Sequence, residues 1–263
     1  IGQSEGLAPA DKKLYALRDV TGTVDSIPLI ASSVMSKKLA SGAQAILLDV
    51  KVGSGAFMKT IEEARALAKA MVDIGRENGR SLKAVLTDMD RPLGHAIGNA
   101  LEIREVIDTL KGHGPEDLTH ECIIMAAHML VLSHICDYET ALTRVREALD
   151  SGAALERLRL MIDAQGGNSS VIDNESLLAI GQCTYDVIAP KAGYITHMNT
   201  EQCGIASVML GAGRTIKDGP IDYSVGIIMH KKIGDAITEG ECIATLYASD
   251  ESLLANAAKT YSE

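Results

Sequence analysis

Three polar side chains near the start of the chain have types and spacing that suit a flat, polar heterocycle. Arg18 comes shortly before a segment with strong helix signals, and Ser33 and Lys37 lie four residues apart inside that segment. Residues four apart stand on one face of a helix, so the hydroxyl and the ammonium point the same way. With the guanidinium they supply two donors that flank an acceptor, which is what a ring N–H between two carbonyl oxygens requires.

This arrangement suits uracil or thymine, but the spacing alone leaves a plainer interpretation open. In that interpretation Arg18 pairs with Asp19 or Asp25, while Ser33 and Lys37 line a solvated helix face. Such triples of polar residues are common on protein surfaces, so the elements around them have to be considered first.

The surrounding elements alternate between helix and strand. Capping signals and Pro28 predict a helix within Asp25–Gly42. The apolar run Ala43–Val50 predicts a buried strand that enters a glycine-rich loop. A helical period over Ile61–Asn78 and a second strand at Ser81–Thr87 follow. The order strand, helix, strand indicates a right-handed crossover unit in a parallel sheet.

The rest of the chain is first helical and then β-rich. Further helices are predicted at Ala100–Leu110, Glu121–Ile135, Tyr138–Leu149 and Ala153–Ala164. After Asn168, short strands separated by glycine turns are predicted at Tyr185–Ala189, Gly193–Met198, Ala206–Leu210, Val225–Ile228 and Cys242–Tyr247. We expect a domain boundary near Gly181.

The predicted fold class is therefore α/β. We expect part of a small helical lobe at 1–42, a large α/β lobe with a mixed sheet at 43–180, and a β-rich module at 181–263. The glycine and acidic turns of that module look like the barrel-sandwich layout of biotinyl and lipoyl carrier domains. The carrier's lysine between two methionines is missing, and Lys231 and Lys232 follow His230 instead. A carrier or scaffold role remains an alternative.

Composition narrows the class of partner. The net charge of -10 leaves no broad basic surface for a phosphate backbone, so nucleic acid is not expected as a partner. No apolar run is long enough to span a membrane, and the N-terminus has no secretory layout. The five widely spaced cysteines fit reduced thiols, so we expect a cytoplasmic protein.

A long run of residues resembles a known family. The run is YALRDVTGTVDSIPLIASSVMSKKLASG, from Tyr15 to Gly42, continued by LLDVKVGSGAFMKT from Leu47 to Thr60. It is similar to the signature of the thymidine and pyrimidine-nucleoside phosphorylases, which are related in fold to anthranilate phosphoribosyltransferase. A less specific match continues through RPLGHAIGNALE and into the C-terminal module. The resemblance covers most of the chain, which corresponds to the C-terminal two thirds of a family member.

The resemblance implies a pentosyltransferase of nucleoside salvage. It would cleave thymidine, uridine or deoxyuridine reversibly with inorganic phosphate, giving the free base and (deoxy)ribose 1-phosphate. Arg18, Ser33 and Lys37 match the family's base-binding residues. Arg18 and Lys37 would act as catalytic cations that stabilise charge on the departing base, and Ser33 would chiefly accept from the ring N–H. A homodimer is the implied assembly.

The resemblance also implies a monovalent cation, usually potassium. Its matching ligands are the carbonyls of Leu93 and Ala96 and the carboxylate of Glu105. The family's phosphate loop has no equivalent in Ile1–Leu14, and a tight turn is a better interpretation of Gly53–Gly55 than an anion site. A catalytically incompetent fragment that binds pyrimidine weakly is therefore a further alternative.

Overall fold

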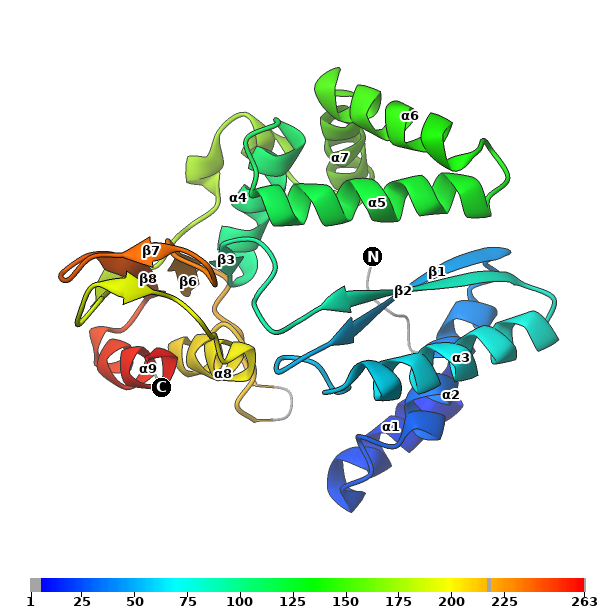
Figure 1. Cartoon of the computed structure of the whole chain (residues 1–263), viewed down its shortest axis with the longest axis horizontal. Coiled ribbons are helices and arrows are strands. Elements are labelled where there is room, and N and C mark those ends of the chain that lie inside the picture. The colour runs from blue at the N-terminus through cyan, green and yellow to red at the C-terminus, as the bar shows by residue number, and fades with distance from the viewer. Residues whose placement is uncertain (1–5, 217–218, 263) are drawn as a thin grey trace. The chain divides into compact units, whose positions relative to one another are not determined.

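The structure is a computed structural model that describes residues 6–216 and 219–262, without the side chains of Asp19 and Val20 (Figure 1). The chain forms two compact units: Ile1–Asp88 with Cys122–Val145, and Met89–Glu121 with Arg146–Glu263. This division differs from the predicted domain limits, because residues 89–121 group with the C-terminal strands and 122–145 group with the N-terminal segment.

The first unit is built around one strand-helix-strand crossover. Its elements are α1 (Pro9–Thr21), α2 (Ile27–Ala40), β1 (Ala45–Val52), α3 (Ile61–Glu77) and β2 (Ser81–Asp88). Strands β1 and β2 pair in parallel along their full length, which confirms the predicted βαβ order. A capping box begins α3: the Thr60 side chain accepts from the Glu63 amide, and the Glu63 carboxylate accepts from the Thr60 amide.

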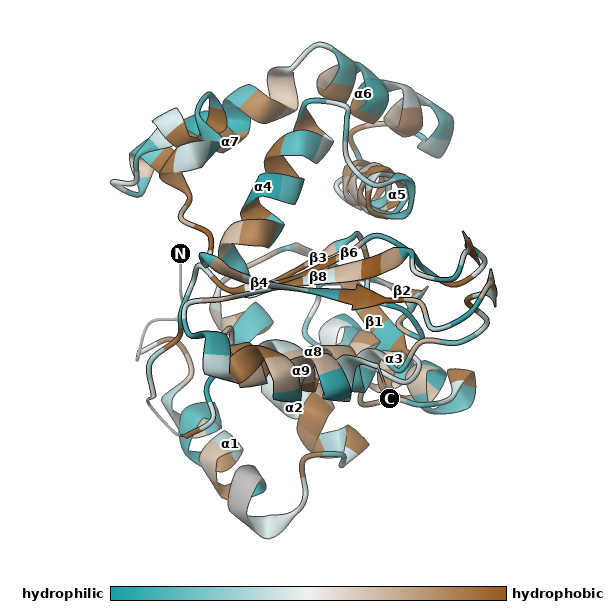
Figure 2. Ribbon diagram, turned by 90° about the vertical axis from the view of Figure 1, so that its left-hand side faces the viewer, coloured by the Kyte–Doolittle hydropathy of each residue, from teal (hydrophilic) through white to brown (hydrophobic). Residues whose placement is uncertain are grey.

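The core of the first unit lies between the strand pair and the helices that cover it. Alternate residues of β1, namely Ile46, Leu48 and Val50, are buried. They belong to one apolar cluster with the buried faces of α3 and α2, and Figure 2 shows the brown, apolar character of the two strands. Helix α2 packs against α3, so the core places α2 at a fixed position in this unit.

The second unit contains the antiparallel strands. Its elements are β3 (Ala96–Ile97), α4 (Asn99–Leu110), α7 (Ala153–Ala164), β4 (Cys183–Ile188), β5 (Gly193–Tyr194), α8 (Thr200–Leu210), β6 (Gly226–Met229), β7 (Ala236–Ile237), β8 (Cys242–Ala248) and α9 (Leu254–Tyr261), with 3-10 turns at Ser169–Ile172, Glu175–Leu177 and Glu251–Leu253. Helices α5 (Glu116–Leu132) and α6 (Tyr138–Asp150) contribute residues to both units.

One antiparallel sheet with the strand order β3-β6-β8-β4 organises this unit. Helices α8 and α9 lie side by side and pack on it through a second apolar core (Figures 1 and 2). Strand β3 comes from the predicted α/β lobe and pairs with β6 of the predicted C-terminal module. Parallel and antiparallel strands therefore occupy separate sheets in the described residues, in place of the mixed sheet that we expected.

Two predictions for the β-rich module are wrong. The segment Ala206–Leu210, predicted as a strand, is the second half of helix α8. Asn199 caps this helix by accepting from the Gln202 amide, and Gly211 ends it in the left-handed conformation. The strand predicted at Gly193–Met198 is limited to Gly193–Tyr194, and α9 was not predicted.

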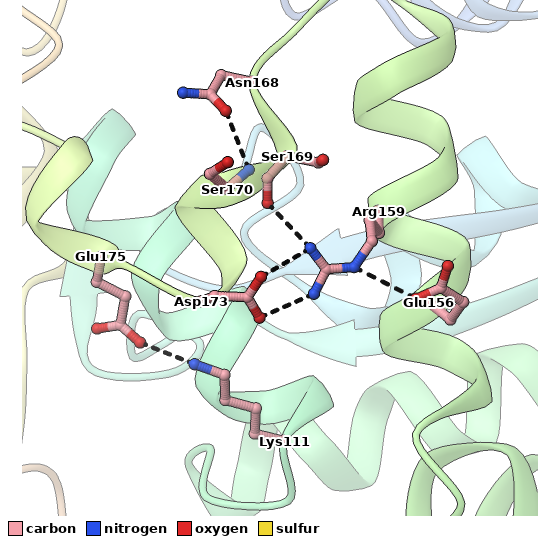
Figure 3. Close-up of polar contacts among 8 residues, drawn as sticks. All are labelled: Lys111, Glu156, Arg159, Asn168, Ser169, Ser170, Asp173 and Glu175. Carbon is pink, nitrogen blue, oxygen red and sulfur yellow. Dashed lines mark hydrogen bonds and ion pairs between the residues drawn. The ribbon is translucent and has the colours of Figure 1, made fainter.

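A polar cluster fastens α7 to the turn that follows it (Figure 3). The Arg159 guanidinium binds both oxygens of Asp173, at 2.9 Å each, and also contacts Glu156 at 3.3 Å. Lys111, the residue that follows α4, contacts Glu175 at 3.2 Å. These contacts fix the 3-10 turns between the helical and β-rich parts of the second unit. Within the described residues, no helix has the length and apolar character needed to cross a membrane.

Candidate active site

Helices α1 and α2 carry all three predicted base-binding residues. Arg18 lies in the last turn of α1, before a left-handed Gly22 at φ 63° lets the chain turn towards α2. Ser33 and Lys37 stand one turn apart on α2. Ser33 and Arg18 are buried at 6% exposure each, while the Lys37 side chain is 29% exposed, so the plainer interpretation does not describe Ser33.

A carboxylate that sequence analysis missed joins these side chains. The Lys37 ammonium donates to Asp11 Oδ2 at 2.8 Å and to Ser33 Oγ at 3.1 Å. Asp11 is itself buried, on α1. It lies seven residues, two helical turns, before Arg18, so the two stand on one face of α1. That spacing was the available signal for Asp11.

The electrostatics of the cluster keep Asp11 ionised. Burial opposes the charged form, but hydrogen bonds from Lys37 and Ser33 and the charges of Lys37 and Arg18 outweigh it and lower the pKa of Asp11 below its ordinary value. All three predicted residues therefore act on one carboxylate. The structure brings Ser33 and Lys37 into direct contact, and it brings Arg18 within electrostatic range of the same group.

Arg18 uses part of its donor set on the backbone. Its guanidinium donates to the carbonyls of Val24 and, at 3.4 Å, Leu29, and lies 5.4 Å from the centre of the Tyr15 ring. The buried Nε has no hydrogen-bond partner among the described residues. The plainer interpretation paired Arg18 with Asp19 or Asp25. The structure shows the guanidinium bonded to backbone carbonyls instead of Asp25, and the side chain of Asp19 lies outside the described residues. An unpaired buried N–H is costly unless a ligand completes it.

The predicted cation ligands lie in the second unit, around the loop that enters β3. Glu105 Oε1 accepts from the amides of His95 at 2.7 Å and Ala96 at 3.0 Å. The Met229 amide donates to the His95 carbonyl, so in the antiparallel pairing the amide and carbonyl of Ala96 face away from β6, on the side of Glu105. The structure thus brings Ala96 and Glu105 together, with Leu93 three residues before Ala96.

Gly94 makes this close approach possible. It has φ 69°, and a Cβ there would lie 2.2 Å from Glu105 Oε2. The carboxylate therefore rests against bare backbone. Burial raises the pKa of Glu105, although the two amides and the charge of Lys232 partly offset this. The Ala96 carbonyl and the Glu105 carboxylate are the oxygen ligands that a hard cation takes.

Lys232 holds the other side of the same loop. Its ammonium donates to the Gly94 carbonyl at 2.7 Å and to Asp117, and the residue is 8% exposed. The neighbouring Lys231 pairs with Glu241 at 2.7 Å and donates to the Ala236 carbonyl at 3.0 Å. Neither lysine projects freely from a hairpin as a carrier's lysine must. Lys232 instead contacts the loop that holds the predicted cation ligands, a role that the sequence did not predict.

The glycine loop after β1 forms a tight turn. The Gly53 amide donates to the Met58 carbonyl at 3.0 Å, and the Ala56 amide donates to the Gly53 carbonyl at 3.0 Å. The ammonium of Lys59 donates to the Ser54 carbonyl at 2.7 Å. These internal bonds agree with the predicted turn at this strand end.

Comparisons with known proteins place this geometry in context. The family model described as "Glycosyl transferase family, a/b domain" matches residues 1–155. A second, "Pyrimidine nucleoside phosphorylase C-terminal domain", matches residues 194–263. The chain is 54% identical over 254 residues to a protein named pyrimidine-nucleoside phosphorylase from Staphylococcus aureus strain bovine RF122 / ET3-1, and equally to that of strain USA300. These alignments cover 96% of this chain and 59% of each relative.

Proposed function

Since the chain belongs to the glycosyl transferase family and carries the C-terminal domain of its pyrimidine-nucleoside phosphorylases, we propose that it forms the base-binding part of a pyrimidine-nucleoside phosphorylase. The chain spans 59% of the length of the curated relatives that it matches. The reaction proposed for the full-length protein is reversible phosphorolysis of thymidine, uridine or deoxyuridine.

In this reaction an oxygen of inorganic phosphate forms a bond to C1′ of the sugar. The bond from C1′ to the pyrimidine nitrogen breaks, and its electron pair leaves with the base. Negative charge then spreads from the ring nitrogen to the carbonyl oxygens. Cations next to those oxygens stabilise the transition state more than the ground state, so they raise the rate of bond cleavage.

Arg18 and Lys37 are the cations that we assign to the carbonyl oxygens, and Ser33 is the acceptor for the ring N–H. One observation supports this assignment above the others: the Lys37 ammonium contacts both Ser33 and the buried carboxylate of Asp11, on which the charge of Arg18 also acts, and its third N–H has no acceptor among the described residues. The unpaired Nε of Arg18, among the described residues, supports it further. The neutral heterocycle of a nucleoside would complete those bonds.

The test is phosphate-dependent release of uracil or thymine by the full-length protein. Removing one preorganised electrostatic contact typically lowers kcat by about 100- to 1000-fold, so we expect such losses for Lys37→Ala and Arg18→Ala. Lys38→Ala is the matched control, because this neighbour on α2 is exposed. Urea midpoints should fall much less than activity. Midpoints that fall as steeply as turnover would make both residues structural.

We also propose that a monovalent cation, potassium in the first instance, binds at Leu93, Ala96 and Glu105. The bound cation would neutralise the Glu105 carboxylate and hold the loop before β3. The position of that carboxylate against Gly94, on the side of the Ala96 carbonyl, supports this assignment. Thermal unfolding in potassium chloride and in choline chloride at equal ionic strength provides the test. A stabilisation specific to potassium should disappear in Glu105→Gln.

The proposed assembly is a homodimer that works in nucleoside salvage in the cytoplasm. Helix α1 supports the dimer, because Leu14, Tyr15 and Leu17 expose apolar surface at 57%, 45% and 57%. The five free cysteines fit a reducing compartment. Sedimentation of the wild type and of a Leu14→Glu, Leu17→Glu variant would test the interface. A variant that sediments as the wild type would remove α1 from it.

A further inference from the structure

Lys232 is a buried cation beside the loop that carries the proposed cation ligands. Its side chain is 10% exposed, and its ammonium donates to the Gly94 carbonyl at 2.7 Å and to Asp117. It comes from the β-rich module and lies 138 residues from Gly94 in the sequence. Like charges repel, so a fixed ammonium at this position must affect which ion binds next to it.

A short series of contacts connects Lys232 with the proposed ligand Glu105. The Gly94 backbone that accepts from Lys232 also lies against Glu105, because a Cβ on Gly94 would be 2.2 Å from Glu105 Oε2. The other oxygen of Glu105 accepts from the amides of His95 and Ala96 at 2.7 Å and 3.0 Å. One ammonium and the carboxylates of Glu105 and Asp117 therefore surround one turn of backbone.

These three groups give the turn a net negative charge. Burial raises the pKa of Asp117, but the hydrogen bond and charge of Lys232 outweigh it and lower that pKa below its ordinary value. Two amide donors favour the ionised form of Glu105. Two negative charges and one positive charge leave a net charge of -1. Asp235 accepts from the Lys232 amide at 2.7 Å but is exposed, so solvent screens its charge.

The other titratable groups near the two described ligands do not change this count. A cavity of about 500 Å³ reaches the ligands, and its lining includes Arg104 and Asp108, one charge of each sign on α4. Glu175, which also lines it, is paired with Lys111 (Figure 3). Burial and the charge of Lys232 lower the pKa of His95, so this imidazole is neutral at neutral pH. One monovalent cation would therefore neutralise the turn, whereas a divalent cation would leave it with a positive charge.

We propose that Lys232 makes this site selective for monovalent over divalent cations, because its ammonium limits the net charge of the turn to -1. This inference rests on the proposed function, which assigns the cation to Leu93, Ala96 and Glu105. The energy between an ion and a fixed charge scales with the charge of the ion, so Lys232 opposes a divalent cation twice as strongly as a monovalent one. Calcium sites in proteins tune their affinity through the number of charged ligands.

The test is the stabilisation of the full-length protein by potassium chloride and by calcium chloride, with choline chloride keeping the ionic strength constant. The rise in the free energy of unfolding with ion concentration gives an apparent Kd for each ion. A unit charge within about 10 Å changes the affinity for a monovalent ion about 10-fold and for a divalent ion about 100-fold. Lys232→Met should therefore shift the preference towards calcium by about 10-fold. Glu105→Gln measures the ions that bind elsewhere on the chain.

Further variants separate the charge of Lys232 from its structural contacts. Asp117→Asn removes one negative charge and should weaken the binding of both ions, calcium more than potassium. The double variant with Lys232→Met returns the net charge to -1 and should restore the wild-type preference, which a damaged fold cannot do. Lys231→Met is the matched control, because Lys231 is paired with Glu241, and it should keep the wild-type preference. Lys232→Gln keeps an N–H donor without the charge, and it replaces Lys232→Met if that variant does not fold.

The outcomes separate this inference from the proposed function. A wild type without any potassium-specific stabilisation that depends on Glu105 would remove the cation site and the inference together, while release of uracil tests phosphorolysis independently. A wild type that binds potassium, with an unchanged preference in the Lys232→Met and Lys232→Gln variants, would overturn the role of Lys232 alone. Tighter binding of calcium than of potassium by the wild type would overturn it too.

Discussion

Replacing Lys232 with methionine should destabilise the second unit far more than the same change at Lys231. Lys232 is 8% exposed and donates to the Gly94 carbonyl and to Asp117, whose side chain is 29% exposed. Removing one partner of a buried ion pair costs about 3–5 kcal/mol, and the partial exposure of Asp117 lowers our expectation to about 2–3 kcal/mol. For a chain of this size that is a loss of about 4–12 °C in Tm.

Thermal and urea unfolding of the two single variants are the assays. Lys231→Met is a matched control, because it removes the same charge from the adjacent residue, whose side chain is 25% exposed against 10% for Lys232. Adding Asp117→Asn to Lys232→Met should recover part of the lost stability, since the uncompensated carboxylate is then neutral. Equal losses for both lysine variants would refute the reasoning that the buried ammonium holds the loop before β3.

Three further perturbations follow from single contacts. Gly94→Ala should lower the free energy of unfolding in urea by at least about 1–2 kcal/mol, because a left-handed backbone and the Glu105 carboxylate both oppose a Cβ. Thr60→Ala should cost about 1 kcal/mol in the same assay through loss of the α3 cap. The pKa of Asp11 is lower in the folded protein than its value of about 3.9 in the unfolded chain, so the ionised group stabilises the fold above that pH. The free energy of unfolding should therefore fall as the pH drops below about 4, and it should fall less in Asp11→Asn.

Local signals predicted the elements whose ends are marked in the sequence. Helix α7 has its predicted limits, Ala153–Ala164, because an apolar period ends at paired glycines. The strand-helix-strand order of β1, α3 and β2 followed from the change between short apolar runs and a helical period, and the structure adds the Thr60 cap, which the prediction did not use. Helix α8 was mistaken for a strand at Ala206–Leu210, because its apolar residues form an almost continuous run without a helical stripe.

The limits of sequence reasoning at the candidate site are long-range contacts. Ser33 and Lys37 were predicted to share a face, because one helix holds both. The contact of Lys37 with Asp11 joins residues 26 apart, and that of Lys232 with Gly94 joins residues 138 apart. No repeating pattern in the sequence links the two residues of either contact. The packing of α1 on α2 and the pairing of β3 with β6 create these contacts.

Each candidate site brings two like charges close together and offsets them with one opposite charge from the protein. Arg18 and Lys37 bring two cations into a buried cluster, and Asp11 offsets them while leaving donors for a ligand. Glu105 and Asp117 bring two carboxylates to one loop, and Lys232 offsets them. Groups held in this way need little reorganisation when a ligand arrives, which is the condition under which fixed charges accelerate a reaction. Removing either counter-charge should therefore change ligand binding even though neither group contacts a reacting atom in this scheme.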